Sequence, residues 1–279
     1  MVRRVALASV ALVLILVAQA PAQTVVSSCG QEVKGFASLN ADLDCTGFVG
    51  NAVTIHGGKL ALNGHTLSGG TIGVYCDRNC LISGPGTITG STSMGVLAYQ
   101  TVVRMQSVDV TNHPTMGIEC FKVCTINGPA TISGNGTGIR AGTVVKVSAM
   151  TLSGNDIGID ASNLDARGHA LVYNSTISGN RIGVSADLLV KTSNSSITGN
   201  TEIGVNAGDG SCSRKGLATI KGGTVTGNGT DADCGTTVAC ADLATCGTPP
   251  HLAGGATCDH SYVNGSGIPG SDWDVCALD

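Results

Sequence analysis

A short pattern of hydrophobic and polar positions recurs every 20 to 25 residues between positions 72 and 234. In each copy, a hydrophobic residue or Thr precedes a Gly, and an Ile or Val follows it. Self-similarity at this period is typical of a solenoid, in which each repeat forms one coil. The copies are centred on Gly73, Gly95, Gly117, Gly138, Gly158, Gly183 and Gly204.

A second pattern, polar–aliphatic–polar, accompanies the first and predicts a strand with one buried face. Its copies are Thr87–Thr89, Thr131–Ser133, Thr151–Ser153, Thr176–Ser178, Ser196–Thr198 and Thr224–Thr226, with Asp109–Thr111 as an imperfect member. A coil of this length is too short for a helix pair but holds three short strands. The first full coil predicts them at 72–76, 80–82 and 87–89. We expect Gly84-Pro85, and Gly128-Pro129 in a later coil, to separate the last two strands.

These segments resemble a known family of repeats. The Thr-Ile-Ser-Gly-Asn sequences at 131–135 and 176–180, and the stretch 62–67, are similar to the repeats of right-handed parallel β-helix proteins of the pectin-lyase-like superfamily. The resemblance covers most of residues 29–234. It implies an all-β, right-handed parallel β-helix of about eight to nine coils. It is specific for fold only, because this fold hosts lyases, hydrolases, epimerases, adhesins and inert stalks.

The alternation after each Gly assigns side chains to faces. We expect two inward columns, Val74, Val96, Ile118, Ile139, Ile159, Val184 and Val205, and Cys76, Ala98, Cys120, Ala141, Ala161, Ala186 and Ala207. The outward column between them is Tyr75, Leu97, Glu119, Arg140, Asp160, Ser185 and Asn206. Arg104 aligns with apolar Ile82 and Ile126, and a shift of one residue would turn it outward and bury Val103 and Met105.

Asn recurs at the corner after the third strand, at Asn112, Asn135, Asn155, Asn180, Asn200 and Asn228. Asn tolerates the left-handed backbone that a tight corner needs. Stacked Asn side chains can also hydrogen-bond to one another along the solenoid. The pattern therefore predicts a structural role.

The first 22 residues have the form of a secretory signal peptide, with Arg3 and Arg4, an apolar run over 5–18 and small residues before the cleavage site. The run is shorter than a membrane span, so we expect cleavage and a mature protein without a membrane span. We then predict an N-terminal cap and first coils over 23–71, β-helix repeats over 72–234 and a Cys-rich C-terminal cap over 235–279. A secreted or cell-surface monomer is expected.

All 12 cysteines follow the predicted signal peptide, and an even number in an exported protein indicates disulfides. Cys29 and Cys45 bracket the first coil. The C-x3-C pairs Cys76/Cys80 and Cys120/Cys124 lie two coils apart, too far to bridge each other, so each is expected to pair locally. A zinc site is the weaker alternative. The pairing of Cys212, Cys234, Cys240, Cys246, Cys258 and Cys276 stays open.

Charged residues form 12% of the chain and the formal net charge is −4. No basic patch is evident, so nucleic acid is not an expected partner. The superfamily resemblance implies acidic residues and a base on the exposed face of one sheet. Here the catalytic candidates are Glu119, Arg140 and Asp160 on successive coils, with Glu119 and Asp160 as candidate calcium ligands. The alternative is a surface ion pair of Arg140 with its neighbours.

Three functions compete. The sequence shows no Lys/Arg cluster for an acidic sugar and no aromatic platform for sugar rings, which weakens the lyase or hydrolase interpretation. We therefore favour a non-catalytic extracellular module that contacts polysaccharide and needs no cofactor. A polysaccharide lyase or glycoside hydrolase is the alternative. The third hypothesis is an ice-binding-like array formed by the paired Thr/Ser columns, although Thr is common in strands in any case.

Overall fold

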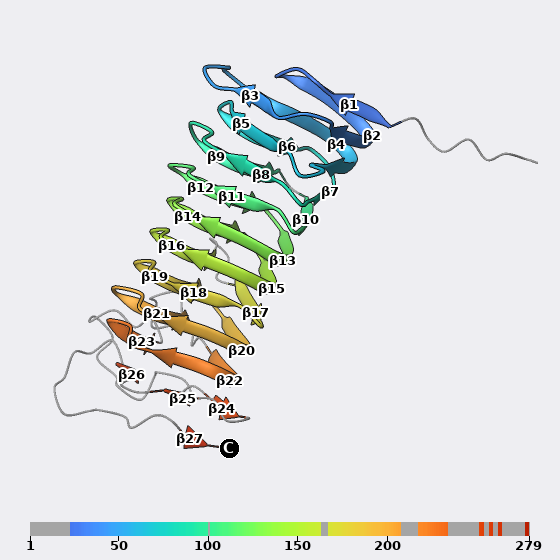
Figure 1. The fold of residues 1–279 in the computed structure, drawn as a ribbon. Coiled ribbons are helices and arrows are strands. Elements are labelled where there is room, and N and C mark those ends of the chain that lie inside the picture. The colour runs from blue at the N-terminus through green and yellow to red at the C-terminus, as the bar shows by residue number, and fades with distance from the viewer. Residues whose placement is uncertain are drawn as a thin grey trace, which may run out of the picture.

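The computed structural model describes residues 23–99, 101–162, 167–207 and 217–233, together with four short strands near the C-terminus. Within these residues the chain is all-β and forms a parallel β-solenoid of about eight turns without a helix (Figure 1). The all-β solenoid predicted from the repeats is thus confirmed. Over the described residues, no helix is long and apolar enough to cross a membrane.

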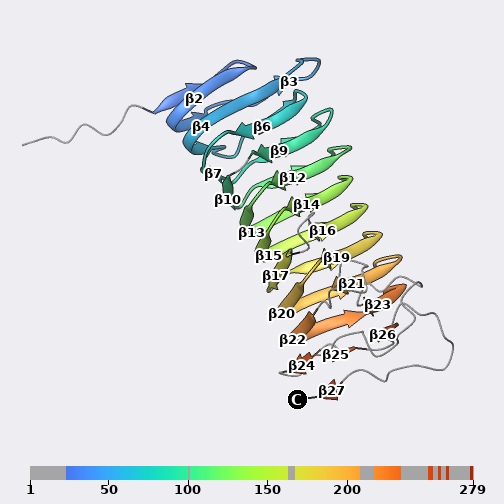
Figure 2. The ribbon, with the colours of Figure 1, turned by 180° about the vertical axis from the view of Figure 1, so that it is seen from behind.

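Three parallel stacks of strands run along the solenoid, and we name them sheets 1, 2 and 3. Most strands of sheets 1 and 2 can be followed in Figure 2, and those of sheet 3 in Figure 1. Sheet 1 contains β6 (Ile72–Cys76), β9 (Met94–Ala98), β12 (Met116–Cys120), β14 (Thr137–Ala141), β16 (Ile157–Ala161), β19 (Ile182–Ala186), β21 (Ile203–Ala207), β23 (Thr230–Asp233), β26 (Tyr262–Val263) and the first parts of β2 (Gln31–Leu39) and β4 (Asn51–Ala61).

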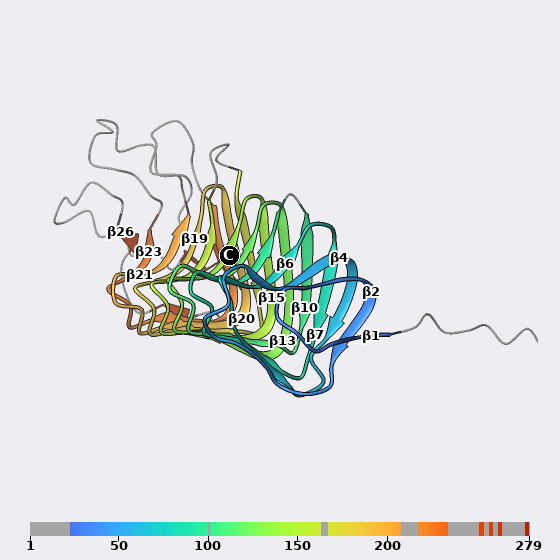
Figure 3. The same cartoon turned by 90° about the horizontal axis from the view of Figure 1, so that it is seen from above.

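Sheet 2 contains β7 (Cys80–Ser83), β10 (Val102–Gln106), β17 (His169–Tyr173), β24 (His251–Ala253), β27 (Ala277–Leu278), the last parts of β2 and β4, and the first parts of β13 (Val123–Ser133), β15 (Val144–Ser153), β20 (Leu189–Thr198) and β22 (Leu217–Thr226). Sheet 3 contains β3 (Leu43–Cys45), β5 (Thr66–Gly69), β8 (Thr87–Thr89), β11 (Asp109–Thr111), β18 (Thr176–Ser178), β25 (Thr257–Cys258) and the last parts of β13, β15, β20 and β22. The first strand, β1 (Thr24–Val26), pairs with the end of β2. Seen from above, the coils lie over one another (Figure 3).

The corner between sheets 2 and 3 differs from expectation. Gly84-Pro85 separates β7 from β8 as predicted, but Gly128-Pro129 lies inside β13, where the register shifts between Asn127 and Ala130. Long strands such as β15 pass through the corner because a single left-handed residue, Ala149 with φ 56°, bends the chain there. A coil therefore contains two or three strands rather than always three.

The core consists of the inward columns predicted from the repeat. The apolar residues that follow each Gly, and the Cys or Ala residues two positions later, are at most 2% exposed. Met105 pairs in register with Ile82, which leaves Arg104 exposed between buried Val103 and Met105. The one-residue shift inferred at Arg104 is thus confirmed.

Polar side chains are buried at the corner between sheets 3 and 1, where they form a stack that we call the Asn ladder. In each step, the backbone N–H of one Asn donates to the Oδ1 of the Asn one turn later, at 3.0–3.1 Å. Each Nδ2 also donates to a sheet 3 carbonyl of the preceding turn, at 3.0–3.3 Å. The members are the buried Asn135, Asn155, Asn180 and Asn200, and Asn228, which is half-buried.

The ladder begins with a different residue from the one predicted. Asn112 is exposed at φ 61°, in the position that Gly134 occupies one turn later, so it lies outside the ladder. His113 takes the Asn position and is fully buried. Its Nδ1 accepts the Ser91 N–H at 3.2 Å, and its Nε2 lies 3.2 Å from the Ile88 carbonyl oxygen, so we assign the ring hydrogen to Nε2. Burial lowers the pKa of His113, which favours the neutral ring.

The same corner explains the repeated Gly. A Cβ on Gly138 would lie 2.6 Å from the Gly158 carbonyl oxygen and 3.3 Å from the Asn155 side chain. A Cβ on Gly117 would meet Gly138 and Asn135 in the same way. The backbone carbonyl of the next turn therefore leaves no room for a Cβ at these positions, and the Asn side chain crowds the same space.

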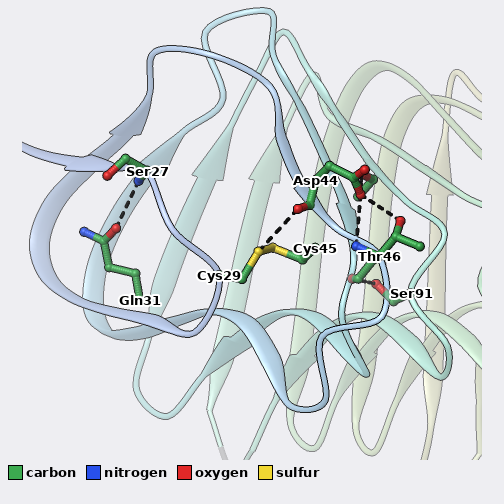
Figure 4. Close-up of a disulfide and its surroundings, with 9 residues drawn as sticks. Ser27, Cys29, Gln31, Asp44, Cys45, Thr46 and Ser91 are labelled. Atoms are coloured by element: carbon green, nitrogen blue, oxygen red, sulfur yellow. Dashed lines mark hydrogen bonds between the residues drawn. A yellow bond between two sulfur atoms is a disulfide. The ribbon is translucent and has the colours of Figure 1, made fainter.

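Three disulfides join Cys29–Cys45, Cys76–Cys80 and Cys120–Cys124, with Cα–Cα distances of 5.6, 6.1 and 5.7 Å. These are the local pairs expected from the spacing, and Figure 4 shows the first of them beside Asp44. The predicted signal peptide lies outside the described residues. So do Cys212, Cys234, Cys240, Cys246 and Cys276, and the side chain of Cys258.

Candidate functional site

The three predicted site residues lie side by side on the outer face of sheet 1. Glu119 on β12 is in register with Arg140 on β14, which is in register with Asp160 on β16. Arg140 Nε lies 3.5 Å from Asp160 Oδ2. Among the ion pairs of the described residues, none joins Arg140 to Glu119. Arg140 is therefore paired with one neighbour only.

Asp160 belongs to the outward column but is only 9% exposed, less than its predicted position on the open face suggested. Its Oδ1 accepts the Ser162 N–H at 3.1 Å and the Ser162 hydroxyl, while Oδ2 faces Arg140. These contacts tie the Asp160 carboxylate to the turn after β16 and to Arg140.

Glu119 has a different environment. Burial raises the pKa of Glu119, and the positive charge of Arg140 partly opposes this shift. Two carboxylates with different environments can divide acid and base roles in hydrolysis. Glu119 would then be the acid, because a raised pKa favours its protonated form.

Glu119 and Asp160 of the same column are the expected calcium ligands. Within the described residues, no group of three or more His, Cys, Asp or Glu side chains is placed to hold a metal ion. Arg140 lies in register between Glu119 and Asp160, so a cation bound by both carboxylates would lie beside a guanidinium that repels it.

An aromatic pair lies at the end of the same sheet. Tyr99 follows β9 and Phe121 follows β12, and each is 47% exposed. Their ring centroids are 4.9 Å apart at an interplanar angle of 64°. The two rings meet edge to face and form an exposed aromatic pair, which the sequence analysis did not identify. The signal was present in the sequence, because these aromatic residues are one repeat apart and follow the same inward column.

A second polar cluster, which sequence analysis missed, lies nearer the N-terminus. His56 Nδ1 is 2.5 Å from Asp77 Oδ2, and His56 Nε2 is 3.0 Å from Glu32 Oε2. The hydrogen bond with Asp77, followed by that with Glu32, raises the pKa of His56. Both ring nitrogens are engaged, so this His bridges three consecutive turns.

Comparison with known proteins does not identify the chain: no protein-family model, no curated protein and no solved structure matches it.

Proposed function

We propose that the protein is a secreted, non-catalytic module of the right-handed β-helix type that contacts polysaccharide through Tyr99 and Phe121. The exposed aromatic pair is the observation that carries this proposal. Sugar rings present C–H faces that pack on aromatic rings, and exposed aromatic residues beside polar groups mark recognition surfaces. The neighbouring Glu119–Arg140–Asp160 column supplies hydrogen-bonding groups along the same face.

Two further observations support the proposal. The three disulfides are consistent with folding in an oxidising, extracellular compartment. Asp160 already accepts hydrogen bonds from Ser162 and faces Arg140, which favours a structural over a catalytic carboxylate. Residues that hold one another in this way are suited to a rigid contact surface.

The test presents a panel of neutral and acidic polysaccharides to the mature protein and measures binding by calorimetry. Turnover is followed in the same panel by the absorbance of lyase products and by the reducing ends that hydrolysis releases. The double variant Tyr99→Ala/Phe121→Ala should lose neutral-glycan binding and keep its fold. Phe48→Ala, which removes an aromatic side chain elsewhere, should bind normally. Product formation that disappears in Glu119→Gln would instead establish the enzyme hypothesis.

A second candidate function comes from sheet 3. Its outward positions form two hydroxyl-rich columns, Thr66, Thr87, Asp109, Thr131, Thr151, Thr176, Ser196 and Thr224, and Ser68, Thr89, Thr111, Ser133, Ser153, Ser178, Thr198 and Thr226. Hydroxyls then repeat about every 4.8 Å along the stack and about every 6.7 Å along a strand. Such a regular array supports the ice-binding hypothesis, with Asp109 as its interruption.

Thermal hysteresis of a freezing solution tests this candidate. If sheet 3 binds ice, Thr151→Lys and Thr176→Lys should each abolish hysteresis, because a long charged side chain separates the array from a flat lattice. Thr125→Lys on sheet 2 should have no effect. A mature protein without hysteresis would exclude the candidate.

A further inference from the structure

The outer face of sheet 2 carries a regular row of positive charges. Register pairing places Lys59, Leu81, Arg104, Thr125, Lys146, Leu171 and Lys191 in one column. Every second member is cationic, and we call Lys59, Arg104, Lys146 and Lys191 the cationic row. The prediction that the chain has no basic patch and no Lys/Arg cluster is therefore wrong. The strands that carry the row, β4, β10, β15 and β20, can be followed down the solenoid in Figure 1.

These cations point to solvent. Arg104, Lys146 and Lys191 are exposed and each lies between two buried residues of its strand, while Lys59 is half-buried. The described strands of sheet 2 have no Asp or Glu at their outward positions. Within the described part of the chain, no member of the row forms an ion pair. The positive charge of this face is thus not neutralised, although the whole chain has a formal net charge of −4.

The carboxylates lie elsewhere. Glu119 and Asp160 are on sheet 1, while Asp156 and Glu202 flank Arg181 at the corner between sheets 3 and 1. Sheet 1 and this corner therefore carry charges of both signs, while the described outward positions of sheet 2 carry cations without carboxylates. A face with charge of one sign attracts ligands of the opposite sign and raises their local concentration.

Apolar groups accompany the row. Val102, Val123 and Val144 stack in the neighbouring outward column. Lys146 Nζ lies 5.9 Å from the centroid of the Tyr173 ring. Beside Arg104 the surface has a hollow of about 300 Å³, lined by Gly58, Asn79, Cys80, Leu81, Val102 and Arg104. The face therefore combines a row of cations, a neighbouring column of valines and a depression.

We propose that the outer face of sheet 2 binds a linear acidic polysaccharide, whose carboxylates pair with the cationic row. Alternate turns place the charges about 9.6 Å apart, because strands stack about 4.8 Å apart. That repeat is comparable with the length of a disaccharide, so a uronic-acid polymer with at least one carboxylate in each disaccharide matches several cations at once. The valine column suits the C–H faces of sugar rings.

The face is less suited to single-stranded nucleic acid. Such ligands bind through successive stacking of bases on aromatic side chains. In the described strands of sheet 2, the outward aromatic residues are Phe36 and Tyr173, which lie about six turns apart. A uronic-acid polymer is therefore the better match for the row.

This inference goes beyond the sheet 1 proposal and shares only the general class of ligand with it. The test measures the affinity of the mature protein for polygalacturonate at low and high salt. Binding should weaken with salt, because exposed charge pairs are screened. Replacing all four cations of the row by Gln should weaken low-salt binding about tenfold or more and remove most of the salt dependence. The variant's melting temperature should be unchanged, since the side chains are at the surface.

A second variant tests position rather than total charge. It carries the same four Gln substitutions together with Thr151→Lys, Thr176→Lys, Thr198→Lys and Thr226→Lys on sheet 3, so its net charge equals that of the wild type. It should remain as weak as the Gln variant. Recovery of wild-type affinity would show binding by net charge alone and overturn the proposal.

Two further results bear on the proposal. Tighter binding of single-stranded poly-dT than of polygalacturonate would overturn it in favour of a nucleic acid. Tyr99→Ala/Phe121→Ala should bind polygalacturonate like the wild type. Loss of binding in that variant, but not in the Gln variant, would place the ligand on sheet 1 and refute the sheet 2 site.

Discussion

The Asn ladder and the Glu119–Arg140–Asp160 column are both stacks of polar side chains on consecutive turns, yet they differ in burial and in bonding. In the ladder, the same residue recurs and its side-chain groups are hydrogen-bonded. In the column, the residues differ from turn to turn, and Arg140 and Asp160 form an ion pair of 3.5 Å. The comparison shows that a buried polar repeat carries the fold, while outward columns can vary without disturbing it.

Removing one rung of the ladder should have the largest effect. In Asn155→Ala, the N–H and Nδ2 of Asn135 lose their acceptor, and the Ile132 carbonyl loses its donor. Leaving buried polar groups unpaired costs about 1–3 kcal/mol each, so we expect a loss of about 3 kcal/mol or more. Urea denaturation of the variant measures it.

The matched control is Asn112→Gly. This Asn is exposed, has φ 61° and does not belong to the ladder. Gly adopts that conformation readily, so the substitution should change stability by less than about 1 kcal/mol. Equal losses in both variants would mean that the ladder has no special role.

His113 should make stability fall at acid pH. Its pKa is lowered by burial in the folded state, whereas an unfolded His protonates near pH 6.5. Below about pH 6.5 the unfolded state therefore binds more protons, and stability falls by at most about 1.4 kcal/mol per pH unit. Denaturation at pH 8 and pH 5 measures the difference.

His113→Asn sharpens this prediction, because Asn is the ladder residue on the later turns. The variant should fold and lose the part of the pH dependence that His113 contributes. The contribution of His56 is common to both proteins and cancels in the comparison. An unchanged acid response in His113→Asn would contradict the assignment of His113 to the ladder.

Arg140→Ala should have a small effect. Its contact with Asp160 is 3.5 Å long, and the Arg140 side chain is 41% exposed. Such pairs contribute about 0–1 kcal/mol, so the loss should be under about 1 kcal/mol. The pKa of Glu119 should rise further, because Arg140 holds it down. A carboxyl titration by NMR would detect this. A large loss of stability would mean that the column supports the fold as the ladder does.

Calcium should have the smallest effect of all. With Arg140 between the two carboxylates, we expect no heat of micromolar calcium binding in calorimetry and no change in melting temperature. Micromolar binding that disappears in Asp160→Asn would instead make the column a metal site and favour the enzyme hypothesis.

Parts of this molecule could be predicted from sequence because a strand has a period of two. Burial of Val103 and Met105 around Arg104 followed from that period alone. The aromatic pair and the cationic row were missed although their spacing is regular. Tyr99 and Phe121 are one repeat apart, but the members of the row are two repeats apart, and the intervening Leu81, Thr125 and Leu171 hide the column when turns are compared one by one.

The sequence by itself determined the solenoid, its inward columns and the three local disulfides, because each depends on contacts within one turn or between adjacent equivalent turns. The tertiary structure decided which residue begins the ladder, since register places His113 rather than Asn112 opposite Asn135. It also decided that the outward cations of sheet 2 line up in one column. That alignment depends on the register of strands about 20 residues apart in sequence, which the identity of any single residue does not reveal.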